Sequence, residues 1–426
     1  MLPFAAAQGF SFADPYAIGL VFVGAVLLVA VVALTKERER AFTSAIVYLL
    51  FGAAASAALS LLGVELLDPF SDYEVIERLA EFAVVISLFG AGLRIDRPLG
   101  WRAWRSPLLL LVIAMPVTIA GIALWGTAVM GLSLGAAVIL GAALAPTDPV
   151  LASDVQVGPP GDDDEPEPNF ALTAEAGGND GLAFPFVFLG IYIAAEGGTD
   201  WLGTWALADV LYAIPAGVAL GAISGSGMAR LSMLLRRRSL MHERFDGWLA
   251  VAATLAVYGI AEIAGTYGFL AAFAAGLAFR RHEAEHESHA RVHGGAETVE
   301  HFCELALVLL LGSTVTLAGL AEPGLGGWLL IPVLLLVIRP VATGIALLRS
   351  GVRRDERLFI GWFGIRGIGS FYYVAVALHA GVLAADEASI VYWTVVACVG
   401  VSIVAHGLTS TPAMRLRRSN RRRSRV

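Results

Sequence analysis

The sequence predicts an all-α polytopic membrane protein with about thirteen transmembrane helices. Of its 426 residues, 57% are hydrophobic and only 15% are charged, and the mean hydropathy is +0.74. Soluble domains are about half apolar and about a quarter charged, so this composition excludes an ordinary soluble fold. The net charge of −7 provides no basic face. We therefore expect a lipid bilayer as partner, no nucleic acid and no cofactor.

Apolar stretches long enough to cross a bilayer recur along the whole chain, since a transmembrane helix needs roughly 20 such residues. The thirteen expected spans are 16–34, 43–62, 76–93, 107–129, 132–152, 171–195, 204–229, 247–264, 265–280, 299–320, 327–348, 357–381 and 388–413. These spans fill most of the chain. We therefore expect a single transmembrane domain over residues 1–426, with a basic cytoplasmic tail at 414–426 and no soluble regulatory domain.

The loops between these spans alternate in charge. Arginine-rich loops occur at 36–40, 94–105, 230–244, 280–291, 349–357 and 415–425. The positive-inside rule then places the N-terminus outside the cell membrane and the C-terminus in the cytoplasm, as an odd number of spans requires. One cytoplasmic loop, 162–167, is acidic instead. It is either a solvated loop or a vestibule that attracts cations.

Ionisable side chains inside the spans are candidates for function, because each costs at least about 2.5–3.5 kcal/mol in the bilayer. They are Glu81, Asp148, Asp154, Glu175, Asp180, Glu262, Glu304, Arg339 and Arg366. Acids outnumber bases in this set. Carboxylates in a low-dielectric cavity favour cations or protons as ligands over anions or sugars.

The fifth span contains two prolines that bracket a polar pair, in the order Pro146, Thr147, Asp148 and Pro149. Each proline removes an amide donor and clashes with the preceding turn, so the helix should break here. Broken helices at membrane depth expose backbone groups to an ion. A kink near a helix end, capped by Thr147 or Asp148, is the alternative.

The twelfth span is also expected to be interrupted, because glycines flank Arg366 at Gly364 and Gly367. If the seventh span is a linker, spans 5 and 12 occupy corresponding places in two halves of six helices. Interrupted helices at matching positions are typical of inverted six-helix repeats whose broken helices cross at the binding site.

The sixth span carries Glu175, Asn179 and Asp180. Glu175 and Asn179 share a helix face, while Asp180 lies about 100° further round. One acid can therefore meet a structural partner while Asp180 faces a cavity. There it could exchange a proton for a metal cation.

The two buried arginines need acidic partners. Arg366 is expected to pair with Glu175, since a guanidinium matches a carboxylate and keeps its proton. Arg339 is expected to be neutralised by Glu304 or another acid. Glu81 is the remaining supporting buried charge.

Three motifs together resemble the monovalent cation:proton antiporter-1 family, the NhaP-type sodium/proton exchangers. They are Ala145-Pro146-Thr147-Asp148-Pro149-Val150, Glu175-x-x-x-Asn179-Asp180 and Gly364-x-Arg366-Gly367. The resemblance implies a homodimer, each protomer having a dimerisation domain and a mobile six-helix core domain. It implies that Asp180 carries the monovalent cation or the proton, that Asn179, Asp148 and Thr147 line the site, and that Glu175 and Arg366 form a structural ion pair.

The sequence departs from the family pattern at two places. Ala176 stands where the family often has a serine, and the run 87–92 lacks the glutamate that many members carry late in the third helix. Na⁺ preference is therefore open, with K⁺ or Li⁺ as alternatives. Asn179 resembles the electroneutral branch, so we expect one cation to exchange for one proton.

A histidine cluster matches the zinc-protease pattern His-Glu-x-x-His. It comprises His282, His286, His289 and His293. A zinc site needs a further ligand and a cleft. The alternatives are adventitious metal binding, a solvated segment, or a pH sensor, because histidine titrates near neutrality.

Two rival classes of function remain. A sodium-coupled solute symporter would need a second polar cluster to hold an organic substrate. A channel would need a repeated filter motif, and a membrane enzyme a nucleophile or metal set; the histidine cluster is the one hint of the latter.

Overall fold

The computed structural model describes residues 41–61, 68, 70–152, 155–158, 165–196, 198–240, 246–283 and 288–424, together with 21, 24, 25 and 28. Within these residues the regular elements are helices and no strand occurs. The all-α prediction is confirmed.

The helices follow one another in chain order. They are α2 (Ala41–Leu61), α3 (Tyr73–Arg94), α4 (Arg105–Leu109), η2 (Leu110–Ala114), α5 (Met115–Ala128), α6 (Leu134–Leu144), α7 (Glu167–Ala195), α8 (Trp201–Thr204), η4 (Trp205–Tyr212), α9 (Ala213–Arg237), α10 (Asp246–Ile263), α11 (Gly268–Glu283), α12 (Ser288–Thr314), η6 (Gly319–Ala321), α13 (Gly324–Val333), η7 (Leu334–Ile338), α14 (Arg339–Ala346), α15 (Arg354–Trp362), α16 (Gly369–His379) and α17 (Ala385–Ser424).

The expected spans correspond closely to these helices. The first span, 16–34, lies almost wholly outside the described residues; each of the others has a helical counterpart. Among the described residues, five helical segments are long and apolar enough to cross a membrane: Arg105–Ala128, Glu167–Ala195, Trp201–Arg237, Gly324–Ala346 and Ala385–Arg415. The fifth and twelfth spans do not qualify because their helices are interrupted.

Three of the long segments contain a widened π-helical turn, and a proline follows each one. Pro116 comes after η2, Pro215 after η4 and Pro340 after η7. A proline cannot donate the backbone hydrogen bond of its own turn, and its ring pushes the preceding turn outward. The widened turn is a common way for a helix to accommodate this.

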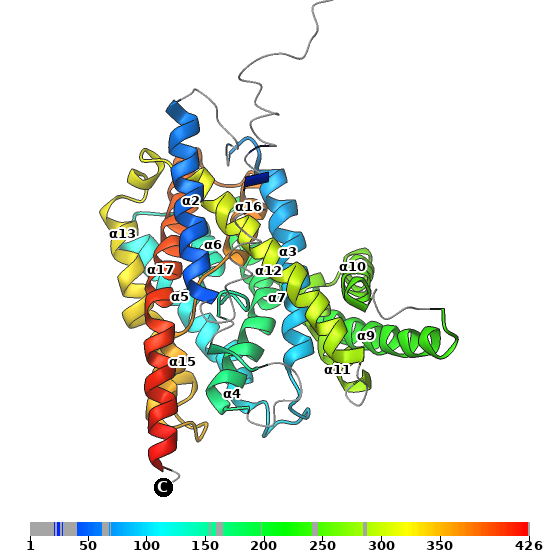
Figure 1. Cartoon of the computed structure of the whole chain (residues 1–426). Coiled ribbons are helices and arrows are strands. Elements are labelled where there is room, and N and C mark those ends of the chain that lie inside the picture. The colour runs from blue at the N-terminus through cyan, green and yellow to red at the C-terminus, as the bar shows by residue number, and fades with distance from the viewer. Residues whose placement is uncertain are drawn as a thin grey trace, which may run out of the picture.

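Figure 1 shows α9, α10 and α11 on one side of the molecule and α13 and α17 on the other, with α3, α6, α7, α12 and α16 between them. α11 packs closely on α9 and α3, α12 on α2, and α6 on α5 and α7. The two interrupted stretches, 145–152 and 363–368, are buried in the bundle, where irregular backbone is shielded from lipid.

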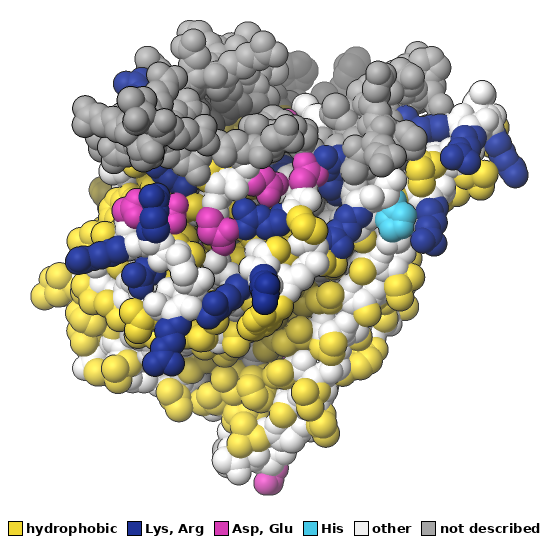
Figure 2. Space-filling model, turned by 90° about the horizontal axis from the view of Figure 1, so that it is seen from below, with side chains coloured by type: hydrophobic (Ala, Val, Ile, Leu, Met, Phe, Trp, Pro, Cys, Tyr) yellow, Lys and Arg dark blue, Asp and Glu magenta, His cyan; other side chains and the backbone are white. Residues whose placement is uncertain are grey.

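Arginine and acidic side chains lie on the face of the molecule at which α17 finishes. Figure 2, seen from the end at which α17 finishes, shows arginine and acidic side chains above flanks that are largely hydrophobic. Exposed arginines include Arg102, Arg105, Arg353 and Arg354, from two of the loops expected in the cytoplasm. This distribution agrees with a multi-pass membrane protein.

Candidate functional site

The fifth span is broken as expected. α6 ends at Leu144, and the chain from Pro146 runs without regular helix past Asp148. The Asp148 carboxylate oxygen Oδ1 accepts hydrogen bonds from the backbone N–H groups of Val150 at 2.8 Å and Leu151 at 2.9 Å. An aspartate that bonds the backbone just ahead of it stabilises a turn, so Asp148 itself fixes the shape of the break.

The twelfth span is interrupted between α15, which ends at Trp362, and α16, which begins at Gly369. This break contacts the first one. The Asp148 N–H donates to the Ile365 carbonyl at 2.9 Å, and the Ile368 N–H donates to Asp148 Oδ2 at 2.9 Å. Asp148 thus accepts from three backbone amides and joins the two broken segments.

Gly367 allows this close contact. A Cβ atom at this position would lie 2.0 Å from Asp148 Oδ2. We expect Gly367→Ala to destabilise the folded protein by about 1–3 kcal/mol, as overpacked positions do. Thermal unfolding of the purified protein in detergent measures this loss. Gly344→Ala is the matched control, because a Cβ there meets nothing within 4 Å; equal unfolding temperatures for the two variants would contradict the prediction.

Asp180 and Asn179 lie deep in α7, beside the two broken segments. Both are almost completely buried, at 3% and 1% exposure. The Asn179 amide nitrogen donates to Thr147 Oγ1 at 2.8 Å, which links α7 to the broken fifth span. Its oxygen Oδ1 has no hydrogen-bond partner among the described residues. The predicted set of Asp180, Asn179, Asp148 and Thr147 therefore lies together.

Tyr373 on α16 is a neighbour that the sequence did not single out. Its hydroxyl lies 2.6 Å from the Asp180 backbone oxygen and 3.2 Å from Asp180 Oδ1. The start of α16 also touches this carboxylate, since a Cβ on Gly369 would lie 2.9 Å from Asp180 Oδ1. Within the described part of the chain, no hydrogen bond reaches Asp180 Oδ2.

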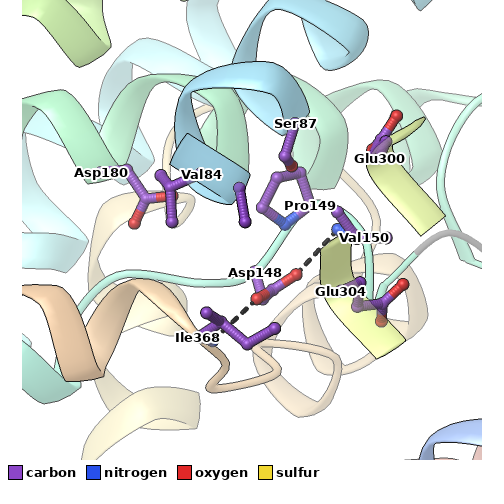
Figure 3. Close-up of a pocket in the computed structure, with 10 residues that line it drawn as sticks. Val84, Ser87, Asp148, Pro149, Val150, Asp180, Glu300, Glu304 and Ile368 are labelled. Carbon is purple, nitrogen blue, oxygen red and sulfur yellow. Dashed lines mark hydrogen bonds between the residues drawn. The ribbon is translucent and has the colours of Figure 1, made fainter. Parts of the chain in front are cut away.

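A small cavity connects these groups. Its lining residues are Ala83, Val84, Ser87, Asp148, Pro149, Val150, Asp180, Glu300, Glu304 and Ile368. Figure 3 shows Asp148 between Asp180 on one side and Glu304 on the other, with Ser87 and Glu300 on the far side of Pro149. Its volume of about 10 Å³ for the centre of a water molecule is close to what one water requires. The cavity therefore has the size for a small ion.

The predicted pairing of Glu175 with Arg366 is wrong. Glu175 instead forms a two-pronged ion pair with Arg339, through N–H···O contacts of 2.6 and 2.7 Å. Arg339 begins α14, directly after the widened turn η7. Both side chains are 2% exposed or less, so the pair is one of the most deeply buried in the bundle.

Arg366 has a different task. Its guanidinium donates to the carbonyl of Ala145 and, at 3.0 Å, to that of Pro146. The C-terminal end of a helix leaves carbonyls without hydrogen-bond partners and carries a partial negative charge. A guanidinium can donate hydrogen bonds to these carbonyls and balance the charge. Arg366 was predicted to need an acid, but the end of α6 supplies its acceptors.

Of the two remaining predicted charges, one lines the cavity and the other does not. Glu304 lines the cavity, and its carboxylate faces His301 at 3.5 Å. Of the two alternatives predicted for Arg339, Glu304 is therefore not its partner, and the other acid is Glu175. Glu81 pairs with Arg78 at 2.8 Å and accepts a hydrogen bond from Tyr258. It stabilises the contact between α3 and α10.

Glu300 is a second residue that sequence reasoning missed. It lies one turn before Glu304 on α12 and pairs with Arg94 of α3 at 3.0 Å. The i,i+4 spacing of two glutamates at the start of an apolar span was the available signal, since such residues share a helix face.

The histidine cluster is only partly described. His282, near the end of α11, lies 3.0 Å from the Ala278 carbonyl and 3.5 Å from Arg230. His286 and the side chains of His289 and His293 lie outside the described residues. In the part of the chain that is described, no group of three or more metal-binding side chains comes together. The pH-sensor reading stays a prediction.

Residues 162–164 of the acidic loop lie outside the described residues, as does Asp154. Glu165 of this loop accepts a hydrogen bond from the Asp96 N–H at 3.2 Å and lies 3.7 Å from Arg97. Partial burial raises the pKa of Glu165 above its usual range, although these neighbours lower it in part. This contact ties the loop to the end of α3.

Fold and site together define a polytopic membrane transporter built around two interrupted helices whose breaks contact each other. The sodium/hydrogen exchanger transmembrane family matches residues 15–415, and the chain belongs to this family. The predicted resemblance is confirmed. The family is one of transporters rather than enzymes.

Individual relatives agree with this assignment. A probable Na⁺/H⁺ antiporter of Schizosaccharomyces pombe is 30% identical over 72% of this chain and 42% of its own length. The K⁺/H⁺ antiporter NhaP of Alkalimonas amylolytica is 24% identical over 93% of this chain and 66% of its own. The chain thus spans about two fifths of the first of these relatives.

The fold has a solved counterpart. The sodium proton antiporter MjNhaP1 of Methanocaldococcus jannaschii superposes with a TM-score of 0.73 at 18% identity, covering 95% of this chain and 99% of that one. At this identity the likeness concerns the fold alone.

Proposed function

We propose that the protein exchanges a monovalent cation for a proton, one for one, with Asp180 as the shared carrier. The observation that carries this proposal is the position of Asp180. It lies buried on the wall of a cavity of ionic size, and one carboxylate oxygen has no hydrogen bond from the described residues. The Asp180 carboxylate is neutralised by either a proton or a cation, so the two compete.

The neighbours of Asp180 support electroneutral exchange. Asn179 is neutral, and the carboxylate of Asp148 is occupied by three backbone amides. Asp180 is then the aspartate that cycles between protonated and cation-bound forms. Asn179 and Thr147 would add neutral oxygen ligands.

Transport by alternating access fits the crossed architecture. In this proposal the two sets of six helices are inverted repeats, whose broken members cross at the site. The chain forms one transmembrane domain over 1–426 with a basic tail at 414–426, and it works as a homodimer in the cell membrane. Its N-terminus is outside and its C-terminus is in the cytoplasm. The exposed loop arginines at the end of the molecule where α17 finishes, such as Arg102 and Arg353, favour this orientation.

The cation is Na⁺ in this proposal, with K⁺ or Li⁺ as alternatives. The Schizosaccharomyces pombe relative is named for Na⁺ and the Alkalimonas amylolytica relative for K⁺. Carboxylate and carbonyl oxygens suit any of these hard cations. The cavity has room for about one water molecule, which argues against a sodium-coupled symporter, because an organic solute needs a much larger pocket.

Vesicles that contain the purified protein test this function. After a pH gradient is imposed, adding Na⁺, Li⁺ or K⁺ outside should dissipate it, and clamping the membrane potential at different values should leave the rate unchanged. A rate that follows the potential would contradict one-for-one exchange. No response to any of the three cations, with protein present in the vesicles, would contradict the function itself.

A further inference from the structure

The run 87–92 of α3 contains no carboxylate. The space beside Gly90 in this run is nevertheless filled, by a glutamate from another helix. A Cβ atom on Gly90 of α3 would lie 2.7 Å from the carboxylate oxygen Oε2 of Glu300, which belongs to α12. A side chain at position 90 and the side chain of Glu300 therefore compete for one place. Gly90 leaves that place to the glutamate from the neighbouring helix.

Glu300 is paired on one oxygen only. Oε2 accepts from Arg94 at 3.0 Å, whereas Oε1 has no hydrogen-bond partner among the described residues. The residue is 1% exposed. A buried carboxylate oxygen left without a partner is costly, and it is an available acceptor for a cation.

Ser87 provides a second unused oxygen at the same place. Its hydroxyl is buried, at 6% exposure of the residue, and has no partner in the described part of the chain. Ser87, Gly90 and Arg94 follow one another along a single face of α3, since they are three and four residues apart. Ser87 and Glu300 both line the cavity that contains Asp148 and Asp180 (Figure 3).

We infer that Glu300 is a ligand of the transported monovalent cation, supplied by α12 in the place that a side chain on α3 would otherwise fill, with the Ser87 hydroxyl beside it. This inference rests on the proposed function. Because Arg94 balances the charge of Glu300, the added ligand leaves the one-for-one exchange at Asp180 unchanged. Because Ser87 lies on α3 and Glu300 on α12, the site remains complete only while the spacing between these two helices is unchanged.

Glu300→Gln tests the charge. Losing one charged contact should raise the apparent KM for Na⁺ about tenfold to a hundredfold, with kcat within about twofold of the wild type. The ratio of KM values for Li⁺, Na⁺ and K⁺ should also shift. A purely structural partner of Arg94 would instead lower the amount of folded protein or kcat and leave KM and the cation ratios unchanged, which would overturn the inference.

A second test moves the carboxylate from position 300 on α12 to position 90 on α3. It does not depend on whether Glu300→Gln folds as well as the wild type. In Gly90→Glu/Glu300→Ala the carboxylate returns from α3, and the KM for Na⁺ should recover to within a few-fold of the wild type. Gly90→Gln/Glu300→Ala has the same shape without the charge and should stay impaired. Equal KM values for these two double variants would overturn the inference.

Cation binding without transport separates this inference from the proposed function. Na⁺ should raise the unfolding temperature of the wild type in detergent, and of the relocated variant, but much less that of Glu300→Gln. If wild-type vesicles exchange no cation, the proposed function fails while this comparison still decides the role of Glu300. An equal Na⁺-dependent rise in all variants would refute the ligand role.

Discussion

Replacing Asp180 with asparagine is expected to reduce cation-driven proton movement to the level of vesicles without protein. Asparagine keeps nearly the same shape, but it neither releases a proton nor carries the charge that holds a cation. The hydrogen bonds from Tyr373 to this residue can largely persist, so the fold should survive. The measurement is the initial rate of pH-gradient dissipation on addition of Na⁺, at equal amounts of protein per vesicle.

Asp209→Asn is the matched control for this prediction. Asp209 lies in η4, accepts a hydrogen bond from Tyr267 at 3.1 Å and does not line the cavity. It is a partly buried aspartate elsewhere in the bundle, so its replacement should leave exchange close to that of the wild type. Robust exchange by the Asp180 variant would reject the shared-carrier mechanism. Equal loss in both variants would show that the effect is structural.

Arg339→Met is expected to cause the largest loss of stability, because it leaves Glu175 charged and alone in the interior. Breaking one side of a buried ion pair costs about 3–5 kcal/mol, whereas replacing both partners with apolar residues of similar size is often neutral. The yield of folded protein and its unfolding temperature should therefore fall in Arg339→Met and recover in Arg339→Met/Glu175→Met.

The same series distinguishes the two possible partners of Glu175. Arg366→Met should not be rescued by Glu175→Met, because Arg366 donates to the Ala145 and Pro146 carbonyls and those acceptors remain. Rescue of Arg366→Met together with failure to rescue Arg339→Met would restore the pairing that the sequence suggested.

The sequence predicts the helices and the two interruptions because both follow from local chemistry. Apolar length predicts the spans, and Pro146 and Pro149 break the helix wherever it is placed. The closeness of Asn179 and Asp180 is equally predictable, since the two residues are consecutive on one helix.

Partners between helices are where sequence reasoning failed. Arg339 and Arg366 are both buried cations, and nothing in their own segments says which of them meets Glu175. That choice depends on how the two broken segments pack together, because the carbonyls of Ala145 and Pro146 after α6 accept the hydrogen bonds of Arg366. Glu300 was missed for a related reason: its importance comes from Gly90, which is more than two hundred residues away and has no side chain to signal it.

The contact between Asp180 and the first residue of α16 has a consequence for how firmly an ion is held. The beginning of a helix carries roughly half a positive charge from its aligned peptide dipoles. In the proposed mechanism, a cation on Asp180 therefore shares its carboxylate with this fixed partial charge. Such a site retains its ion less tightly than an isolated carboxylate would, and turnover depends on release as much as on capture.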